Sequence, residues 1–245
     1  MIKPEIKELF IECFPDTIKE ADIILEYVEK HGRIHCEYSS DTLVNIICTS
    51  SVNDKSVYFE YIFACGTKKE ARGRGIFKRK LLEVIGNKPA LLIPENDSLI
   101  PMYESLGFTP IYCIKADFGV RKSYSVQEIG IEELYNAYTQ SACLPKKNFS
   151  LFEASMRAFL SYGNKILREE NGFLLMEGET ATEIFAKSKE EMLLLARGCK
   201  SALLPLCLED EIKQLNIPHS KKCFAMAKGI KHENFDDFYI NNLFN

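Results

Sequence analysis

Apolar residues in the first 32 positions recur at the three- and four-residue spacing of amphipathic helices. Residues 4–13 form the first such run, which Pro15 interrupts. The second run begins after an N-cap at Asp16 or Thr17 and closes at Gly32. We therefore expect the chain to begin with two helices.

Beyond the second helix the pattern changes to that of β-strands. Residues 33–38 and 42–49 predict two strands, and the polar triplet 39–41 between them predicts a hairpin turn. Residues 51–55 predict a further turn, and the apolar, aromatic-rich run 57–67 predicts a long strand. Three consecutive strands are therefore expected to follow the two helices.

A loop rich in glycine and arginine follows the long strand and leads into a helix that ends near Ile85. A short buried strand at 90–93, a helix at 98–106 and a strand at 108–116 complete the pattern. This order predicts a mixed α/β layer around one sheet, complete by about residue 118.

The second half repeats this outline more loosely. It predicts helices at 131–142, 151–162, 189–197 and 209–215, and strands at 122–127, 164–169, 172–177, 180–186, 202–206 and 223–227. The predicted fold class is α/β (α+β), with a mixed central sheet flanked by helices. We expect a first domain at 1–118 and a smaller second domain at 119–245.

Composition narrows the class of protein. A net charge of −4 argues against a dedicated nucleic-acid binder. The nine cysteines form no C-x-x-C pair, which favours reduced, mostly buried thiols. The four histidines are scattered, so no metal is expected, even at His31, His35 and Cys36. With no apolar run of membrane-spanning length and no apolar leader, we expect a cytoplasmic protein that does not bind membranes.

The loop after the long strand has the properties of an anion site. Unpaired N–H groups and the helix dipole favour negative charge at a helix start. Gly73 and Gly75 let phosphates approach the backbone. The basic side chains that raise the local potential are Arg72, Arg74, Lys78, Arg79 and Lys80. Two other interpretations are a solvated helix face and a nucleic-acid patch, although the latter would need more aromatic residues than Phe77.

Two motifs carry a family resemblance. Residues 72–77, R-G-R-G-I-F, resemble the R/Q-x-x-G-x-G/A signature of the GNAT superfamily of acyltransferases. Residues 96–108, N-D-S-L-I-P-M-Y-E-S-L-G-F, resemble the same family's N-x-x-A-x-x-x-Y-x-x-x-G-F element. The resemblance covers residues 1–118, and the second half resembles the degenerate domain of tandem-GNAT proteins. Phe77 departs from the family's usual glycine or alanine.

The resemblance implies a binding mode for acetyl-CoA as co-substrate. The pyrophosphate would lie on the loop and helix start, at Arg72, Gly73, Arg74, Gly75, Ile76, Phe77 and Lys78. The pantetheine arm would pair with the backbone of Cys65, Gly66 and Thr67 as an added strand. Asn96 and Tyr103 match the family's residues near the thiol end.

Tyr103 has a chemical role in this scheme. Aminolysis of a thioester expels a thiolate whose conjugate acid has a pKa of roughly 8.5, with cysteine as the guide. A tyrosine of pKa about 10 is protonated at neutral pH and can act as the general acid. The alternative is a tyrosine that only packs in the core.

No general base follows from the residues. Tyr61 occupies the family's usual strand position but is a poor base at neutral pH, and alternation points Glu60 to the opposite face. A water relay or Glu95 is the remaining candidate. Cys65 could be considered as a covalent nucleophile, but a cysteine in an apolar strand is usually a core residue.

The sequence therefore predicts an N-acetyltransferase that transfers an acetyl group from acetyl-CoA to a primary amine by direct attack. The alternative is a non-catalytic acyl-CoA-binding or regulatory module. The acceptor is expected to be a small molecule or a peptide amine. Its identity and the oligomeric state do not follow from the residues.

Overall fold

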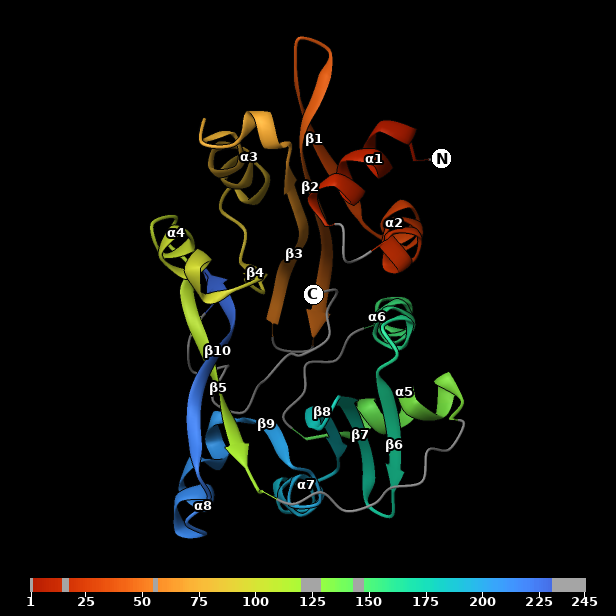
Figure 1. The fold of residues 1–245 in the computed structure, drawn as a ribbon, viewed down its shortest axis with the longest axis vertical. Coiled ribbons are helices and arrows are strands. Elements are labelled where there is room, and N and C mark those ends of the chain that lie inside the picture. Colours follow the sequence, from red (N-terminus) through yellow and green to blue (C-terminus); the bar gives the residue numbers. More distant parts are fainter. Residues whose placement is uncertain (1, 15–17, 55–56, 120–128, 143–147, 231–245) are drawn as a thin grey trace.

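The structure is a computed structural model that describes residues 2–14, 18–54, 57–119, 129–142 and 148–230. Its strands form a single ten-stranded sheet in the order β1-β2-β3-β4-β10-β5-β9-β8-β7-β6 (Figure 1). The pairs β3/β4 and β8/β9 are parallel, and all other neighbouring strands in this sheet are antiparallel.

The helices and strands of the first half confirm the predicted order. They are α1 (Pro4–Cys13), α2 (Ile18–His31), β1 (Arg33–Ser39), β2 (Thr42–Asp54), β3 (Val57–Thr67), the 3₁₀ helix η2 (Lys69–Ala71), α3 (Ile76–Ile85), β4 (Ala90–Leu92), the 3₁₀ helix η3 (Asp97–Leu99), α4 (Ile100–Glu104) and β5 (Thr109–Asp117). The helix predicted at 98–106 is thus divided into η3 and the short α4.

The second half also follows the predicted order. It contains α5 (Ile131–Gln140), α6 (Phe149–Ser161), β6 (Lys165–Glu169), β7 (Gly172–Glu177), β8 (Thr180–Ala186), α7 (Lys189–Ala196), β9 (Ser201–Pro205), the 3₁₀ helix η4 (Leu206–Leu208), α8 (Glu209–Gln214) and β10 (His219–Lys228). The strand predicted at 122–127 lies outside the described residues. The last strand begins four residues earlier than the predicted 223.

The turn predicted at 51–55 was wrong, because β2 continues to Asp54. Ser51 pairs with Glu60 of β3, and its hydroxyl donates a hydrogen bond of 2.6 Å to the Glu60 carboxylate. Polar residues normally suggest a turn, but here Ser51 lies inside the sheet, where its hydroxyl is satisfied by a cross-strand hydrogen bond.

The last strands of the two halves are exchanged. β10 lies between β4 and β5, whereas β5 pairs on its other side with β9 of the second half. A boundary at residue 118 would therefore separate β10 from both of its neighbours. The division into two domains stays a prediction, but the two halves share one sheet.

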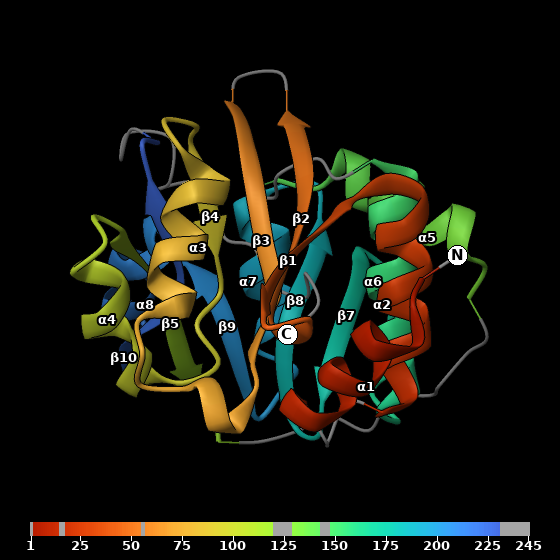
Figure 2. The ribbon, with the colours of Figure 1, turned by 90° about the horizontal axis from the view of Figure 1, so that it is seen from above.

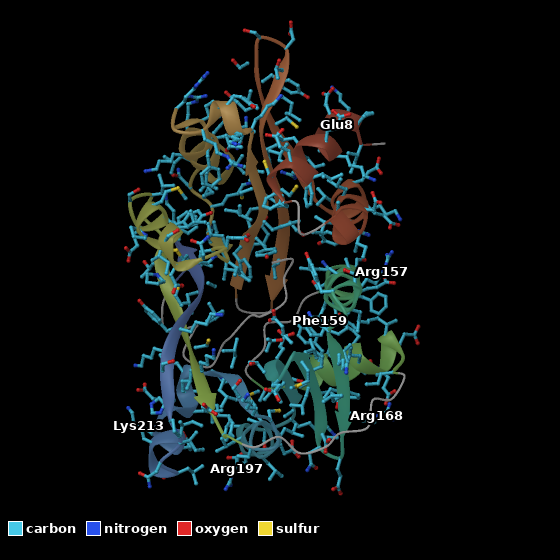
Figure 3. All side chains as sticks on the ribbon, in the orientation of Figure 1. Glu8, Arg157, Phe159, Arg168, Arg197 and Lys213 are labelled. Carbon is cyan, nitrogen blue, oxygen red and sulfur yellow. The ribbon has the colours of Figure 1, made fainter. Side chains whose placement is uncertain are left out.

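Helices cover both faces of the sheet. In the first half, α1 and α2 lie on one face and α3 and α4 on the other (Figures 1 and 2). One buried apolar core under α1 and α2 continues into the second half, and a smaller core lies under α3 and α4. Helix α6 packs beside α2, where Arg157 of α6 lies 3.7 Å from the Glu26 carboxylate (Figure 3). Among the described residues, the structure has no helix long and apolar enough to cross a membrane.

Candidate functional site

The end of β3 presents an open edge. β3 pairs with β4 only from Glu60 to Ile62, because β4 ends at Leu92 while β3 continues to Thr67. Ala64 has a positive φ of 47°, and the pairing of β3 with β2 shifts register at this point. This irregularity is a β-bulge, which bends and twists a strand. Within the described chain, no strand pairs with β3 beyond Ile62 on the β4 side, so an extended ligand has backbone groups to bond there.

The glycine loop continues from this edge. Gly73 and Gly75 have φ of 76° and 71°, a left-handed conformation that suits glycine, and no atom lies within 4 Å of a Cβ built on either. Gly75 is the N-cap of α3, and the first helical bond runs from the Arg79 N–H to the Gly75 carbonyl at 3.1 Å.

The N–H groups of the loop are the feature that fits an anion. Those of residues 73–78 have no acceptor among the described parts of the chain. Such groups at a helix start favour a phosphate, because donors and dipole act together. The predicted pyrophosphate residues are thus brought together in one place.

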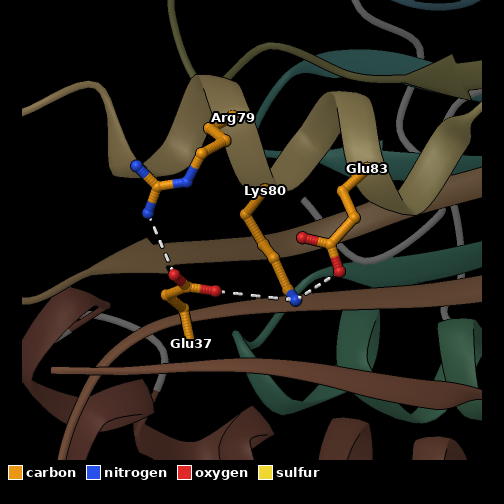
Figure 4. Close-up of polar contacts among 4 residues, drawn as sticks. All are labelled: Glu37, Arg79, Lys80 and Glu83. Atoms are coloured by element: carbon orange, nitrogen blue, oxygen red, sulfur yellow. Dashed lines mark hydrogen bonds and ion pairs between the residues drawn. The ribbon is translucent and has the colours of Figure 1, made fainter.

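The basic side chains around the loop do not all remain available to a ligand. Arg79 and Lys80 both pair with Glu37 of β1, at 2.9 and 3.6 Å, and Lys80 also pairs with Glu83 at 2.9 Å (Figure 4). Their charges therefore tie α3 to the sheet. Glu37 does not stand out in the sequence, because it lies 42 positions from Arg79 and only the fold brings it under α3.

The other cations lie closer to the loop itself. The Arg72 guanidinium donates through Nε to the carbonyl oxygen of Thr67 at 2.9 Å, which fixes the loop against the end of β3. The Lys78 ammonium lies 3.4 Å from the Ser105 hydroxyl, and Arg74 is exposed. Arg74 and Lys78 are thus the loop cations that are best placed to meet an anion.

Tyr103 lies in the small core under α3 and α4. Its ring is 6% exposed and makes edge contacts with Phe77 and Phe108, at ring-centroid distances of 6.1 and 5.9 Å. Cys65 of β3 packs against the same core. Burial raises the pKa of Tyr103, and the nearby Cys65 and Glu95 raise it further. The hydroxyl has no hydrogen-bond partner within the described residues, and its role as a general acid stays a prediction.

The Asn96 side chain already forms hydrogen bonds within the protein. Asn96 is the exposed N-cap of η3, where its side-chain oxygen accepts from the Ser98 N–H at 3.1 Å and from the Ser98 hydroxyl. The side-chain N–H₂ group has no acceptor within the described residues. The structure shows why an asparagine suits this position, and its contact with acetyl-CoA stays a prediction.

Gly66 is held from two sides. A Cβ at this glycine would lie 2.9 Å from the Cys13 sulfur, so glycine allows α1 to pack closely on β3. On the opposite side, the Asn45 amide donates to the Gly66 carbonyl at 2.8 Å and to the Thr67 hydroxyl at 2.9 Å. Asn45 is fully buried, and sequence reasoning missed it. A lone polar residue in the apolar run 43–48 was the signal that could have found it.

The candidates for a general base are dispersed. Tyr61 is buried under α1 and α2, stacks on Phe63 at 5.2 Å, and has a pKa raised well above its usual value by burial. Glu60 is bonded to Ser51 near the start of the strand. Glu95 is exposed and close enough to Tyr103 to affect its pKa. Among these three, Glu95 is the carboxylate on the Tyr103 side of the site.

The cysteine thiols of the site are poor nucleophiles. Burial raises the pKa of Cys65 to about 12 and that of Cys223, on β10, to about 11. Thiols with such pKa values stay protonated at neutral pH, and the reactive form is the thiolate. This favours the interpretation of Cys65 as a packing residue rather than a covalent nucleophile.

Buried thiols also predict how stability depends on pH. Burial raises the pKa of Cys113, which is fully buried, to about 12, whereas an unfolded thiol ionises near 8.5. The buried, protonated Cys113 thiol therefore contributes fully to the free energy of unfolding below about pH 8.5, and this contribution is lost as pH rises toward 12. We expect the free energy of unfolding, measured with urea under reducing conditions, to fall between pH 8.5 and 10, by about 2 kcal/mol from Cys113. Cys113→Ala should make this slope shallower, and an unchanged slope would contradict the assignment.

The corresponding junction of the second half has different chemistry. Between β8 and α7 it has no glycine, and the Ser188 hydroxyl accepts from the Glu191 N–H at 3.2 Å. The Glu191 carboxylate in turn accepts from the Lys187 N–H at 3.1 Å. Side chains of the chain itself thus satisfy this helix start, and its first turn is acidic. These features do not favour a phosphate there.

No group of three or more metal-ligating side chains occurs in the described part of the chain. The expectation of a metal-independent site stays a prediction.

Comparisons with known proteins identify the fold. No family model and no curated protein matches the chain. Among solved structures, a conserved protein from Enterococcus faecalis V583 aligns over 94% of this chain and 70% of its own, with 14% identity and a TM-score of 0.65. A GCN5-related N-acetyltransferase from Kribbella flavida aligns over 91% and 68%, with 15% identity and a TM-score of 0.60. Another from Anabaena variabilis ATCC 29413 aligns over 90% and 68%, with 12% identity and a TM-score of 0.57. The mixed α/β fold of this chain is the fold of GNAT N-acetyltransferase structures.

Proposed function

We propose that the protein is an N-acetyltransferase that transfers the acetyl group of acetyl-CoA to a primary amine of a small molecule or peptide. The observation that carries this proposal is the line of free backbone groups along β3 and α3. An open strand edge at Cys65–Thr67 leads into the unpaired N–H groups of residues 73–78. An extended arm ending in a pyrophosphate has the shape and charge for this surface.

Tyr103 supports transfer rather than binding only. In the proposed reaction, the amine nitrogen attacks the thioester carbonyl, the C–N bond forms and the C–S bond breaks. The Tyr103 hydroxyl gives its proton to the departing thiolate and regains one from solvent, and the attacking nitrogen releases its extra proton to solvent as the amide forms. The ammonium form of the acceptor must lose a proton before it attacks, and Glu95, which is close enough to Tyr103 to raise its pKa, could take this proton through water. A phenol is protonated at neutral pH at its ordinary pKa of about 10, and burial raises the pKa of Tyr103 further, which keeps the proton on the oxygen and makes it a weaker acid.

The proposal is tested by following thiol release from acetyl-CoA in the presence of a panel of amines. Release that depends on both the protein and an amine, with acetylated amine found by mass spectrometry, supports transfer. The second candidate, an acyl-CoA-binding module without chemistry, predicts binding of acetyl-CoA with no turnover on any amine. Failure to bind CoA at all would contradict both functions.

Gly75→Ala is expected to weaken CoA binding. A left-handed conformation costs an alanine about 1–2 kcal/mol, so the loop must strain or turn its N–H groups away. We therefore expect the Kd for CoA, measured by isothermal titration calorimetry, to rise about tenfold. The matched control is Gly86→Ala at the other end of α3, where φ is 55° and nothing lies within 4 Å of the added Cβ. That variant should lose stability but keep its Kd, and equal Kd changes in both would argue against the loop as the binding site.

A further inference from the structure

We infer that Phe77 is a positioning residue for Tyr103, through which the start of α3 holds the general acid in place. This inference deepens the proposed function and rests on it. Phe77 is the position at which the loop sequence departs most from the expected small residue, and the structure gives its side chain a definite contact.

The ring of Phe77 meets that of Tyr103 at an interplanar angle of 83° and a centroid distance of 6.1 Å. The ring of Phe108 also meets that of Tyr103, at an interplanar angle of 69° and a centroid distance of 5.9 Å. Aromatic pairs prefer edge-to-face geometry at about 4.5–7 Å, so both contacts are favourable. One ring from α3 and one from the residue just before β5 thus restrict the rotation of the Tyr103 ring.

The orientation of the Tyr103 side chain depends on packing, because few other contacts fix it. Helix α4, which carries Tyr103, has five residues and no side-chain cap. The hydroxyl of Tyr103 has no hydrogen-bond partner within the described residues that would hold it in one direction. Phe108 is 3% exposed and belongs to the core in any case, whereas Phe77 is only partly buried. The contact with Tyr103 is therefore the specific role of the Phe77 ring.

Phe77 also connects the two ends of the proposed site. Its backbone N–H is one of the unpaired donors at the start of α3, and its ring contacts Tyr103, the residue proposed to act at the thioester end. A small residue at this position would leave the N–H in place and remove the ring contact. Substitution of the side chain thus separates positioning from anion binding.

Steady-state kinetics provide the first test. Phe77→Ala is expected to lower kcat about tenfold, part of the 10²–10⁴-fold contribution typical of a general acid, with the KM for acetyl-CoA within about twofold of the parent. Phe77→Tyr keeps the ring and should restore kcat. In a Tyr103→Phe background, Phe77→Ala should cause no further loss. Leu82→Ala is the matched control, because Leu82 lies on the same helix and is 42% exposed; its kcat should not change.

The second test does not need activity. Protein labelled with ¹³C at the tyrosine ζ carbon is titrated by NMR, and Tyr103 is identified by the resonance missing from Tyr103→Phe. In the parent protein Tyr103 should stay protonated over the whole pH range of the folded state, because burial raises its pKa. In Phe77→Ala water reaches the phenol, so Tyr103 should titrate at lower pH. If the alanine variant does not fold, Phe77→Leu carries the same measurement.

An unchanged Tyr103 titration in Phe77→Ala overturns the inference, whatever the activity. An unchanged kcat in an active enzyme overturns it as well. If the parent protein acetylates none of the amines, the proposed function fails, and the titration alone still decides whether Phe77 positions Tyr103.

Discussion

Tyr103→Phe is expected to lower kcat for acetyl transfer by about 10²–10⁴-fold while acetyl-CoA still binds. The substitution removes one oxygen from a ring held between Phe77 and Phe108, so the packing of the core is retained. The lost group is a protonated hydroxyl with no hydrogen-bond partner among the residues that the structure describes, and the departing thiolate is then left without its donor. Turnover and the Kd for acetyl-CoA are measured on the same preparation.

Tyr162→Phe provides the control for removal of a tyrosine hydroxyl. Tyr162 is 42% exposed and follows α6 in the second half. The Tyr162→Phe variant should leave both the turnover and the Kd for acetyl-CoA unchanged. If Tyr103→Phe also retains full turnover, the tyrosine is a packing residue, and the thiolate must take its proton from water.

The features of the site that could be predicted from the sequence are those formed by residues close together in the chain. Strand, glycine loop and helix start are consecutive in sequence, so the positive φ of Gly73 and Gly75 and the free N–H groups followed from residue types. Tyr103 could be proposed because its motif lies on one short segment. The roles of these residues toward acetyl-CoA stay predictions, since the structural matches establish the fold.

The rest depends on residues that are distant in sequence. Glu37 meets Arg79 across 42 positions, and Asn45 reaches the Gly66 carbonyl across 21 positions. Spacing within a segment cannot predict either contact, because each requires the register of paired strands. The contact between Phe77 and Tyr103 could not be predicted for the same reason, because it forms only when α3 packs against α4.

The exchange of β5 and β10 is the largest feature that the sequence did not predict. Each strand has an ordinary apolar pattern, and that pattern does not determine with which strands it pairs. The consequence for stability is large: we expect residues 1–118, expressed alone, to show no cooperative unfolding transition in urea.

The physical reason is the loss of a central strand. β10 pairs with β4 through Met226 to Lys228 and with β5 along most of its length. Phe224 and Met226 are 4% and 0% exposed. Each fully buried apolar side chain contributes about 1.5–3 kcal/mol, compared with about 5–15 kcal/mol for a whole domain. Loss of both side chains, together with the strand pairing on each side, therefore removes a large part of the stability of the first half.

A designed chain separates the missing strand from the missing domain. The Asp117 N–H donates to the Pro218 carbonyl at 2.9 Å, so the end of β5 and the start of β10 are already adjacent. Residues 1–117 are joined to 218–230 through an Asn-Gly dipeptide, and Pro218→Ala lets position 218 donate the closing hydrogen bond to the Asp117 carbonyl, which proline cannot do. The result is a two-residue hairpin of a favoured type. We expect this chain to regain a cooperative urea transition by circular dichroism, because β4 and β5 recover their neighbour. If residues 1–118 unfold cooperatively without β10, then β5 can pair with β4 directly, and the first half is a domain that does not require the exchanged strand.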